Sequence, residues 1–150
     1  MAWAIISLNS RKALDVPSGN PANGLALQQY IFHGGSNQLW ELQPTTPDSA
    51  AFKIVSQATR KALTLSPGPH HLEDNVQVEQ WPIDDQTSGQ DWGLQLAGYD
   101  ESAAASIFII FAYLSGIVLD VRGGSTEDHA VIQQYTPNGT PAQLWVLQRV

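Results

Sequence analysis

The 150-residue sequence contains no cysteine, and this absence excludes several classes of protein at once. A disulfide framework, a thiol nucleophile and a cysteine-ligated zinc site are all impossible without that residue. A chain of this length can nevertheless bury enough apolar surface in one domain to fold without such cross-links. We therefore expect a single domain over residues 1–150, stabilised by an apolar core.

Positive charge is also scarce. The chain has 7 Lys and Arg against 14 Asp and Glu, and its formal net charge is −7. Binding to nucleic acid requires clustered Lys and Arg, whereas the adjacent basic pairs here are only Arg11–Lys12 and Arg60–Lys61. We expect these pairs to be surface charges at strand ends, and we expect no nucleic-acid partner.

Long apolar runs are missing as well. The most apolar segment, residues 106–114, is far shorter than the roughly 20 residues of a membrane-spanning helix. The N-terminal residues also lack the basic start and long apolar stretch of a signal peptide. These features predict no membrane insertion, and a protein that is cytoplasmic or secreted by an unconventional route.

What the sequence does contain is a threefold repeat, which is best sought before secondary structure. Three tryptophans each follow a glutamine by two positions, at Trp40, Trp92 and Trp145, so the steps are 92 − 40 = 52 and 145 − 92 = 53 residues. Upstream of them, "RKALDV" recurs as "RKALTL" and "SGIVLDV", and "LALQQY" recurs as "VQVEQW" and "AVIQQY". These motifs divide the chain into repeats of about 7–55, 56–108 and 109–150.

Each repeat consists of short, nearly alternating apolar runs separated by turn-forming residues, and the chain has nine Pro and twelve Gly. This pattern is typical of short β-strands and disfavours long helices. We expect an all-β fold with about four short strands per repeat, in which the three repeats close on one another. The repeated apolar positions should form the shared core: Leu14, Leu63, Leu119, Trp40, Trp92 and Trp145.

With its early Leu-Asp-Val, its central Gln-x-aromatic and its late Gln-x-Trp, the repeat resembles the ricin-type (R-type) β-trefoil lectin domain over nearly the whole chain. The resemblance implies a β-trefoil with pseudo-threefold symmetry. It also implies a metal-independent lectin without cofactors that binds galactose- or N-acetylgalactosamine-type glycans and glycoconjugates. With more than one site the protein would act as a multivalent, agglutinin-like lectin.

A sugar site needs an aromatic face for the ring, a carboxylate for adjacent hydroxyls and amides that both donate and accept. The first repeat has all of these at positions that match the family. The resemblance implies that Asp15 and Asn37 bind hydroxyls, that Tyr30 stacks on the ring and that Gln38 supports the carboxylate. Gln28 matches a further contact of the family.

The third repeat keeps Asp120, Gln133, Tyr135 and Gln143, but Ala142 replaces the asparagine. Asn138 in the preceding loop is a candidate substitute, and we expect this site to be weaker than the first.

In the second repeat Thr64 replaces the carboxylate, Glu79 takes the place of Gln28 and Gly89 that of Asn37. Only Trp81 and Gln90 remain of the pattern, so we expect this repeat to be silent.

The sequence offers little for catalysis or metal binding. His70 and His71 lie beside two acidic residues, but adjacent residues of an extended chain point in opposite directions, so we expect a solvated loop and no metal site. His33 and His129 are isolated histidines near the proposed sugar sites, and neither is accompanied by a nucleophile. Glycoside cleavage needs two acids across one sugar ring, whereas repeats 1 and 3 offer one each. We expect no enzyme.

Two other functions remain open. A trefoil that binds no sugar can act as a protease inhibitor or an interaction scaffold through its variable loops, here residues 67–75 and 97–106. The chain could also be the glycan-targeting module of a toxin or a glycoside hydrolase. A homodimer is compatible with all of these readings.

Overall fold

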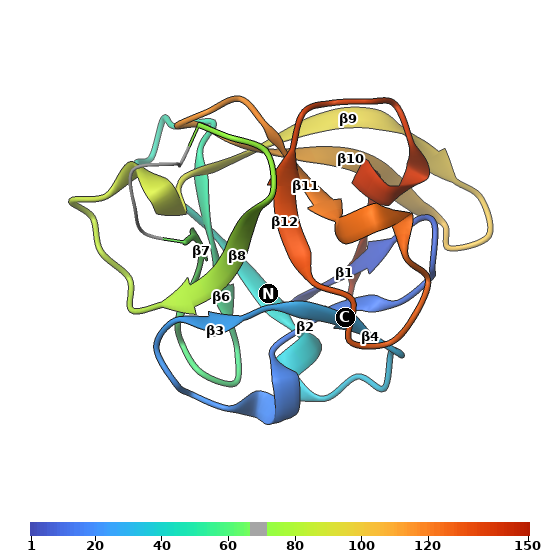
Figure 1. Ribbon diagram of the computed structural model, residues 1–150, viewed down its shortest axis with the longest axis horizontal. Helices are drawn as coiled ribbons and strands as arrows, with labels where there is room; N and C mark the ends of the chain where they lie inside the picture. Colours follow the sequence, from blue (N-terminus) through green and yellow to red (C-terminus); the bar gives the residue numbers. More distant parts are fainter. Residues whose placement is uncertain (67–71) are drawn as a thin grey trace.

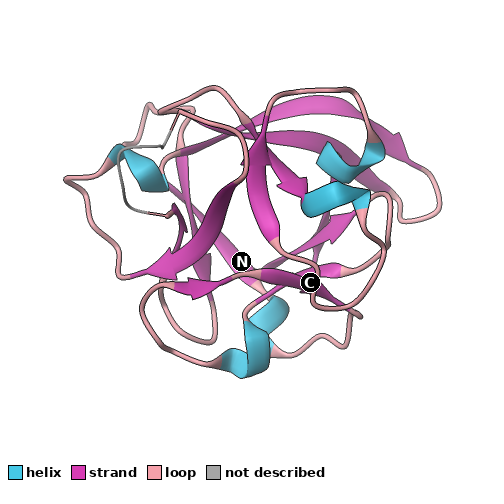
Figure 2. Ribbon diagram, viewed as in Figure 1, coloured by secondary structure: helices cyan, strands magenta, loops and turns pink. Residues whose placement is uncertain are grey.

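The structure is a computed structural model that describes residues 1–66 and 72–150. Its regular elements are short strands and single 3-10 turns (Figure 2). The strands are β1 (Trp3–Ser7), β2 (Ala13–Asp15), β3 (Leu25–Ala26), β4 (Gln28–Tyr30), β5 (Trp40–Pro44), β6 (Phe52–Ser56), β7 (Ala62–Leu65), β8 (Val76–Trp81), β9 (Trp92–Asp100), β10 (Ala105–Ala112), β11 (Val118–Val121), β12 (Ile132–Tyr135) and β13 (Trp145–Arg149). The 3-10 turns are η1 (Pro17–Gly19), η2 (Ser36–Gln38), η3 (Ser88–Gln90), η4 (Arg122–Gly124) and η5 (Pro141–Gln143).

The first and last strands of the three repeats form a closed barrel. Strand β1 pairs with β5 and β13, β6 pairs with β5 and β9, and β10 pairs with β9 and β13, all antiparallel. This ring of six strands has no free edge, which removes the exposed hydrogen-bonding groups of an open sheet. The expected all-β trefoil is confirmed. The repeats of the barrel start at Trp3, Phe52 and Ala105, a few residues before the boundaries expected from the motifs.

The remaining strands form three hairpins, β2–β4, β7–β8 and β11–β12. They lie as three lobes around the centre of the molecule (Figure 1). Strand β8 also pairs with β3 and β12, and a single bridge joins Gln28 to Val131, so each hairpin is tied to both of the others. The candidate site residues lie on these hairpins and on the 3-10 turns, except Asn138, which lies in the loop between β12 and η5.

The predicted core is confirmed. The three repeated leucines and the three repeated tryptophans are all fully buried in one cluster. Each indole N–H donates to the backbone carbonyl of the leucine in its own repeat, at 2.9 to 3.1 Å. Burial of a large ring stabilises the fold through the apolar area removed from water, and the hydrogen bond of its N–H fixes the orientation of the ring. The repeated tryptophan is therefore a core residue.

A second set of residues common to all three repeats was not predicted as structural. Gln29, Gln80 and Gln134, the residues just before the central aromatic, are fully buried. Each side-chain amide donates to backbone carbonyls in the loop of the preceding repeat, counted cyclically, and each accepts from a Ser or Thr hydroxyl of its own repeat. These glutamines fasten the three repeats to one another. Their presence in all three copies was the signal that sequence reasoning passed over.

The basic pairs lie in the turn between the first two strands of a repeat. Arg11 and Arg60 have positive φ angles of 61° and 59°, where the third repeat has Gly116. Arg11 forms an ion pair with Asp100, and Arg60 forms one with Glu41 at 2.9 Å. Their positions agree with the expectation of surface charges at strand ends, and they form no joint basic patch.

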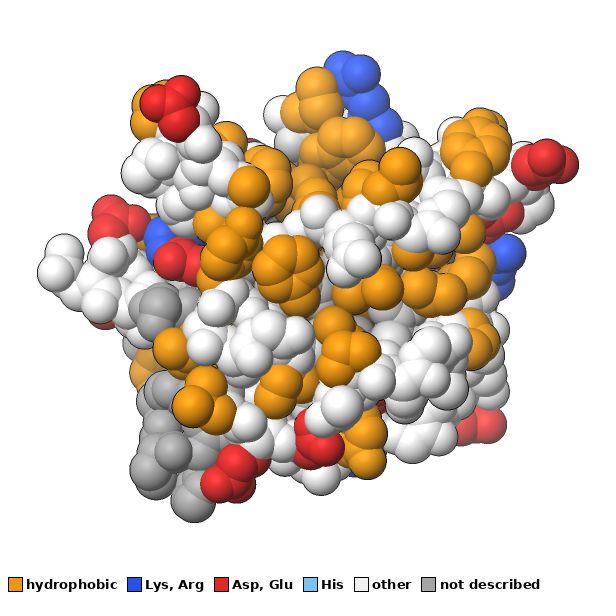
Figure 3. Space-filling model, turned by 90° about the horizontal axis from the view of Figure 1, so that it is seen from above, with side chains coloured by type: hydrophobic (Ala, Val, Ile, Leu, Met, Phe, Trp, Pro, Cys, Tyr) orange, Lys and Arg blue, Asp and Glu red, His pale blue; other side chains and the backbone are white. Residues whose placement is uncertain are grey.

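The hairpin of β9 and β10 is longer than the other strands and carries exposed apolar side chains, with Leu96 67% and Tyr99 60% exposed. Seen from above, the end of the molecule where Figure 1 places this hairpin has many apolar side chains at its surface (Figure 3). The segment 97–106, proposed as a variable loop, consists of the strand ends and a tight turn at 101–104. Within the described residues, no helix has the length and apolar character to cross a membrane.

Candidate functional site

The proposed site residues are brought together by strand pairing. Asp15 lies opposite Gln28 in the β2–β4 hairpin, and Asp120 lies opposite Gln133 in the β11–β12 hairpin. Residues directly opposite in an antiparallel pair have adjacent side chains on one face. The aromatic residue two positions further along the second strand lies on the same face. The sequence motifs therefore converge because of the hairpin register.

In the first repeat the carboxylate of Asp15 is held by three amides. Gln28 Nε2 donates to its Oδ1 at 3.0 Å, while Gln38 Nε2 and Asn37 Nδ2 donate to its Oδ2 at 3.0 and 3.2 Å. The second amide hydrogen of Asn37 is directed at the carbonyl of Val16, at 3.1 Å. A carboxylate has about four lone-pair positions, so Asp15 retains one for a ligand, and Asn37 retains its amide oxygen.

Aromatic rings surround this carboxylate. Tyr30, His33 and His129 line a cavity of about 230 Å³ together with Asp15, Gln28 and Asn37. The ring centroids of Tyr30 and His129 are 5.1 Å apart, and those of Tyr30 and His33 are 6.3 Å apart. All the residues proposed for this site except Gln38 therefore line one small, partly aromatic hollow.

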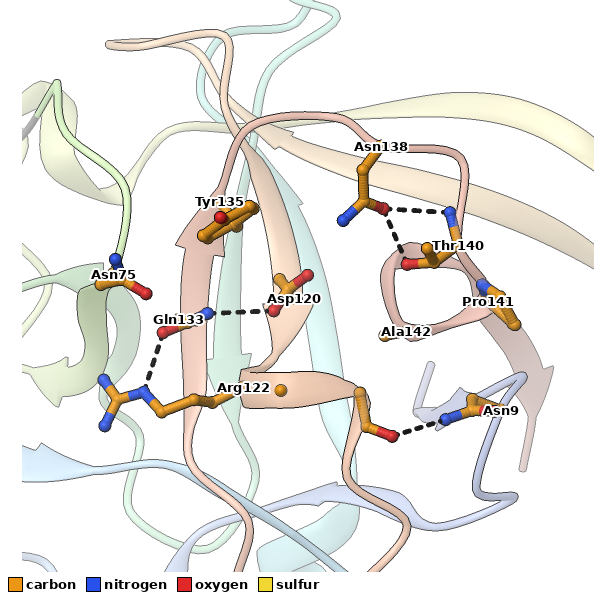
Figure 4. A pocket seen from close by; sticks show the side chains of 12 residues that line it. Asn9, Asn75, Asp120, Arg122, Gln133, Tyr135, Asn138, Thr140, Pro141 and Ala142 are labelled. Atoms are coloured by element: carbon orange, nitrogen blue, oxygen red, sulfur yellow. Dashed lines mark hydrogen bonds between the residues drawn. The ribbon is translucent and has the colours of Figure 1, made fainter.

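In the third repeat the carboxylate of Asp120 has fewer partners. Gln133 Nε2 donates to its Oδ1 at 3.1 Å and Gln143 Nε2 to its Oδ2 at 3.0 Å. The oxygen of Gln133 accepts from Arg122 Nε at 2.9 Å, so the amide is fixed from both ends (Figure 4). Asp120 therefore retains about two lone-pair positions where Asp15 retains one. Because Ala142 stands where the first repeat has Asn37, the carboxylate of Asp120 can accept one more hydrogen bond from a ligand.

The third-repeat cavity is also the larger, at about 560 Å³. Asn138 lines it, as the sequence suggested, but the amide oxygen of Asn138 is taken by its own loop. It accepts from Thr140 N at 3.0 Å and Thr140 Oγ1 at 2.7 Å, and the amide nitrogen points to the cavity side (Figure 4). Asn138 can thus donate to a ligand, whereas Asn37 in the first repeat can accept.

Both carboxyl groups have a pKa above the usual value, because burial penalises the charged form. Hydrogen bonds from the neighbouring glutamines oppose this rise at each site. The remaining charges differ: His33 and His129 lower the pKa of Asp15, while the carboxylate of Asp74 raises the pKa of Asp120 further.

The second repeat retains the cavity, but Thr64 stands at the position of the hairpin carboxylate. Trp81, Gln90, Thr64 and Gly89 line a cavity of about 410 Å³, together with Asp84 from the following loop. Glu79, opposite Thr64 in the hairpin, is not among its lining residues, because its carboxylate accepts from Trp81 Nε1 at 3.0 Å and from Gln77 at 2.7 Å. The carboxylate of Glu79 is therefore held by side chains of its own strand.

The glutamine of each Gln-x-Trp motif is a positioning residue. Gln38 and Gln143 are buried, donate to the carboxylate and to a loop carbonyl, and accept backbone N–H groups of the same loop. Gln90 does the same in the second repeat, with Thr64 Oγ1 in place of the carboxylate at 3.2 Å. Gln38 and Gln143 therefore hold the carboxyl group, and Gln90 holds a hydroxyl, with amides that the protein itself already occupies.

Several cavity residues were not predicted from the sequence. Arg122, Asn75, Asn9 and Thr140 line the third cavity, and Ser18 lines the first. Asn75 is a residue of the second repeat, so only the fold could place it there. Arg122 directly follows the Leu-Asp-Val motif, where the first repeat has Pro17, and that difference between copies was a readable signal.

The described residues contain no cluster of three His, Asp or Glu side chains placed to hold a metal ion. His70 and His71, considered above for such a site, lie outside the described residues.

The profile of the family described as "Ricin-type beta-trefoil lectin domain-like" matches residues 1–81 and 88–150. The chain therefore belongs to this family, as its sequence motifs suggested. None of the curated proteins searched matches this sequence.

Among the similar solved structures, two examples share more than a quarter of their aligned residues with this chain. A designed threefold-symmetric protein, ThreeFoil, is 29% identical with a TM-score of 0.85, and 99% of each chain is covered. An exo-β-1,3-galactanase from Clostridium thermocellum is 28% identical with a TM-score of 0.86. That match covers 99% of this chain and 30% of the galactanase chain.

A ricin B-like lectin from Macrolepiota procera, solved in complex with lactose, is 19% identical with a TM-score of 0.78. The match covers 100% of this chain and 96% of that one. At this identity the likeness shows the fold alone, which is the ricin B-like trefoil.

Proposed function

We propose that this protein is a carbohydrate-binding lectin that recognises galactose- or N-acetylgalactosamine-type glycans through the cavities of its first and third repeats. One observation carries the proposal: in these two repeats a buried, amide-held carboxylate and an aromatic side chain line the same open cavity. In the second repeat Thr64 stands in the cavity at the position of this carboxylate, and the carboxylate of Glu79, opposite Thr64, accepts from Trp81.

The mechanism follows from this arrangement. The carboxylate accepts hydrogen bonds from adjacent sugar hydroxyls, and the amides of Gln28 or Gln133 hold it in place without a metal ion. The ring of Tyr30 or Tyr135 covers the apolar face of the sugar. Charge-assisted hydrogen bonds of this kind are stronger than neutral ones, and their geometry selects among the orientations of neighbouring hydroxyls.

Each site should be weak on its own, with a Kd on the order of 0.1 to 10 mM, since a shallow site buries little area and must desolvate several hydroxyls. Two sites on one rigid domain can bind two branches of a glycan or two chains on a surface. The second binding event is then effectively intramolecular and raises the overall affinity by orders of magnitude. The expected activity is agglutination or capture of glycoconjugates, without catalysis.

The matched region of the galactanase is a minor part of that enzyme, and we propose no glycosidase activity for this chain. Glycoside cleavage uses two carboxyl groups across one bond. In each proposed cavity one carboxylate lines the wall, that of Asp15 or that of Asp120.

A glycan array compares the unmodified protein with the double variant Asp15→Thr/Asp120→Thr. Threonine is the matched replacement because Thr64 already occupies this position in the second repeat and accepts from its glutamine. We expect galactoside binding by the unmodified protein, in EDTA as well as in buffer, and none by the variant. Equal binding by both proteins would show that these carboxylates do not bind the sugar.

Self-association is a second candidate property, favoured by the exposed apolar side chains Leu96 and Tyr99 on the long β9–β10 hairpin. A homodimer through this face would bury them and double the number of sugar sites. Sedimentation of the unmodified protein and of Leu96→Ser/Tyr99→Ser tests this. A dimer that becomes monomeric in the variant supports the contact, and a monomer in both excludes it.

A further inference from the structure

In each repeat, one residue outside the sequence motifs lies beside the candidate site of the next repeat. This position lies four residues before Gln28, Glu79 or Gln133 and is held by Gly24, Asn75 and His129. All three have positive φ angles, of 75°, 67° and 71°. Each donates its backbone N–H to the carbonyl of the buried glutamine in the next repeat, Gly24 to Gln80, Asn75 to Gln134 and His129 to Gln29, at 2.9 to 3.0 Å.

This hydrogen bond fixes the backbone at this position but does not determine which side chain stands there. Left-handed φ angles are tolerated best by glycine, and next by residues such as asparagine and histidine. These are the three residue types found here, so the side chain can change while the backbone and its hydrogen bond stay the same. Gly24 lies against the ring of Trp81, and His129 lies beside that of Tyr30. Asn75 lines the same cavity as Tyr135.

At the first site the position supplies a ring. His129 belongs to the third repeat, but its imidazole is 5.1 Å from the ring of Tyr30, tilted by 52°. Its Nδ1 lies 3.1 Å from Gln28 Oε1, and Gln28 in turn donates to Asp15. His129 therefore forms one side of the small cavity of about 230 Å³ and also orients the amide that holds the carboxylate.

At the third site the same position supplies a compact amide. Asn75, from the second repeat, lines the cavity of about 560 Å³ and lies beside Gln133 and the guanidinium of Arg122 (Figure 4). At the second site Gly24 supplies no side chain, and a Cβ atom built there would lie 3.0 Å from Trp81 Cζ2. In all three repeats the position thus borders the following site.

We propose that this position, contributed by the preceding repeat, determines the ligand selectivity of each sugar site. The inference rests on the proposed function and adds a residue from outside the repeat that carries the carboxylate. His129 encloses the first site, which then favours a single terminal monosaccharide held between two rings. Asn75 leaves the third site open and offers it an amide, so that site also contacts the second sugar of a disaccharide.

The test exchanges the two side chains in proteins that keep one site each. Asp120→Thr leaves the first site, and His129→Asn is added to it; Asp15→Thr leaves the third site, and Asn75→His is added to that. Galactose and lactose are titrated into all four proteins by calorimetry, and the ratio of their affinities is compared. We expect the preference for lactose to rise about two- to tenfold with His129→Asn and to fall by a similar factor with Asn75→His.

The two single-site parents separate this inference from the proposed function. If neither parent binds either sugar, the proposed function fails and the inference falls with it. If the parents bind but both exchanges leave the lactose-to-galactose ratio unchanged, the inference is overturned and the proposed function stands. His129→Gly, which introduces the residue type found beside the second site, should change the ratio in the same direction as His129→Asn. Equal thermal unfolding of all variants confirms the fold.

Discussion

The first and third repeats place a carboxylate at the corresponding position of corresponding hairpins, β2–β4 and β11–β12, yet the residues around it differ. Asp15 is held by three amides in a small cavity lined with rings, whereas Asp120 is held by two amides in a larger cavity with polar sides. The third repeat has Ala142 where the first has Asn37. This difference removes one polar group from the third site and leaves one more lone pair of the Asp120 carboxylate free to accept a hydrogen bond. We therefore expect the two sites to differ in the ligands they accept.

The largest effect on sugar binding should come from giving the second repeat the polar residues of the first. The triple variant Thr64→Asp/Glu79→Gln/Gly89→Asn restores the carboxylate and both amides beside Trp81. A Cβ atom at position 89 meets nothing closer than 3.5 Å, so the asparagine fits.

We expect this variant to gain a third galactoside site, measured as an increase in binding stoichiometry by calorimetry. Thr64→Asp alone is the control, because it places a second carboxylate opposite Glu79 and should bind poorly. A triple variant that folds and binds no additional sugar would show that the second cavity differs from the others by more than its polar groups.

Acidic pH should affect the two native sites next most strongly. Binding requires the ionised carboxylates, whose pKa values burial raises above the usual 3.8. Affinity should therefore fall as the pH drops through these raised pKa values. We expect the third site to fail first, because Asp74 raises the pKa of Asp120 while two histidines lower that of Asp15.

Stability should move in the opposite direction. A carboxyl group with a raised pKa in the folded state contributes stability that is fully present below its unfolded pKa and is lost as the pH rises through its folded pKa. The free energy of unfolding of the native protein, taken relative to Asp15→Thr/Asp120→Thr, should decline across this range while sugar affinity increases. Parallel changes in affinity and relative stability would contradict the assigned role of burial.

The smallest effect should follow the replacement Asn37→Ala, which gives the first repeat the residue of the third. One hydrogen bond to a hydroxyl contributes about 0.5–1.5 kcal/mol, so the first-site affinity for galactose should fall about two- to tenfold in the Asp120→Thr background. Asn37→Asp keeps the size and the acceptor oxygen but adds charge beside Asp15, and it should bind worse than Asn37→Ala. Complete loss of binding in Asn37→Ala would mean that Asn37 is essential for holding Asp15.

The fold was readable from the sequence because three motifs recur in register, and repeated apolar residues such as Leu14 and Trp40 can only be explained by a shared core. The carboxylates and their opposite glutamines were readable for the same reason, since hairpin register follows from the motifs. His129 was noticed near a site, but its role and that of Asn75 depend on contacts between repeats. His129 contacts Gln28 across 101 residues of sequence, and Asn75 contacts Gln134 across 134 − 75 = 59 residues. Contacts over such separations leave no local sequence pattern, and neither does cavity size.

The central claim is that two carboxylates, one in each of two repeats, carry the binding of sugar. Its most direct test is the stoichiometry of galactoside binding, measured by titration of the native protein, Asp15→Thr, Asp120→Thr and the double variant under the same conditions. We expect two sites per chain in the native protein, one in each single variant and none in the double variant. Sites that persist in the double variant would contradict it.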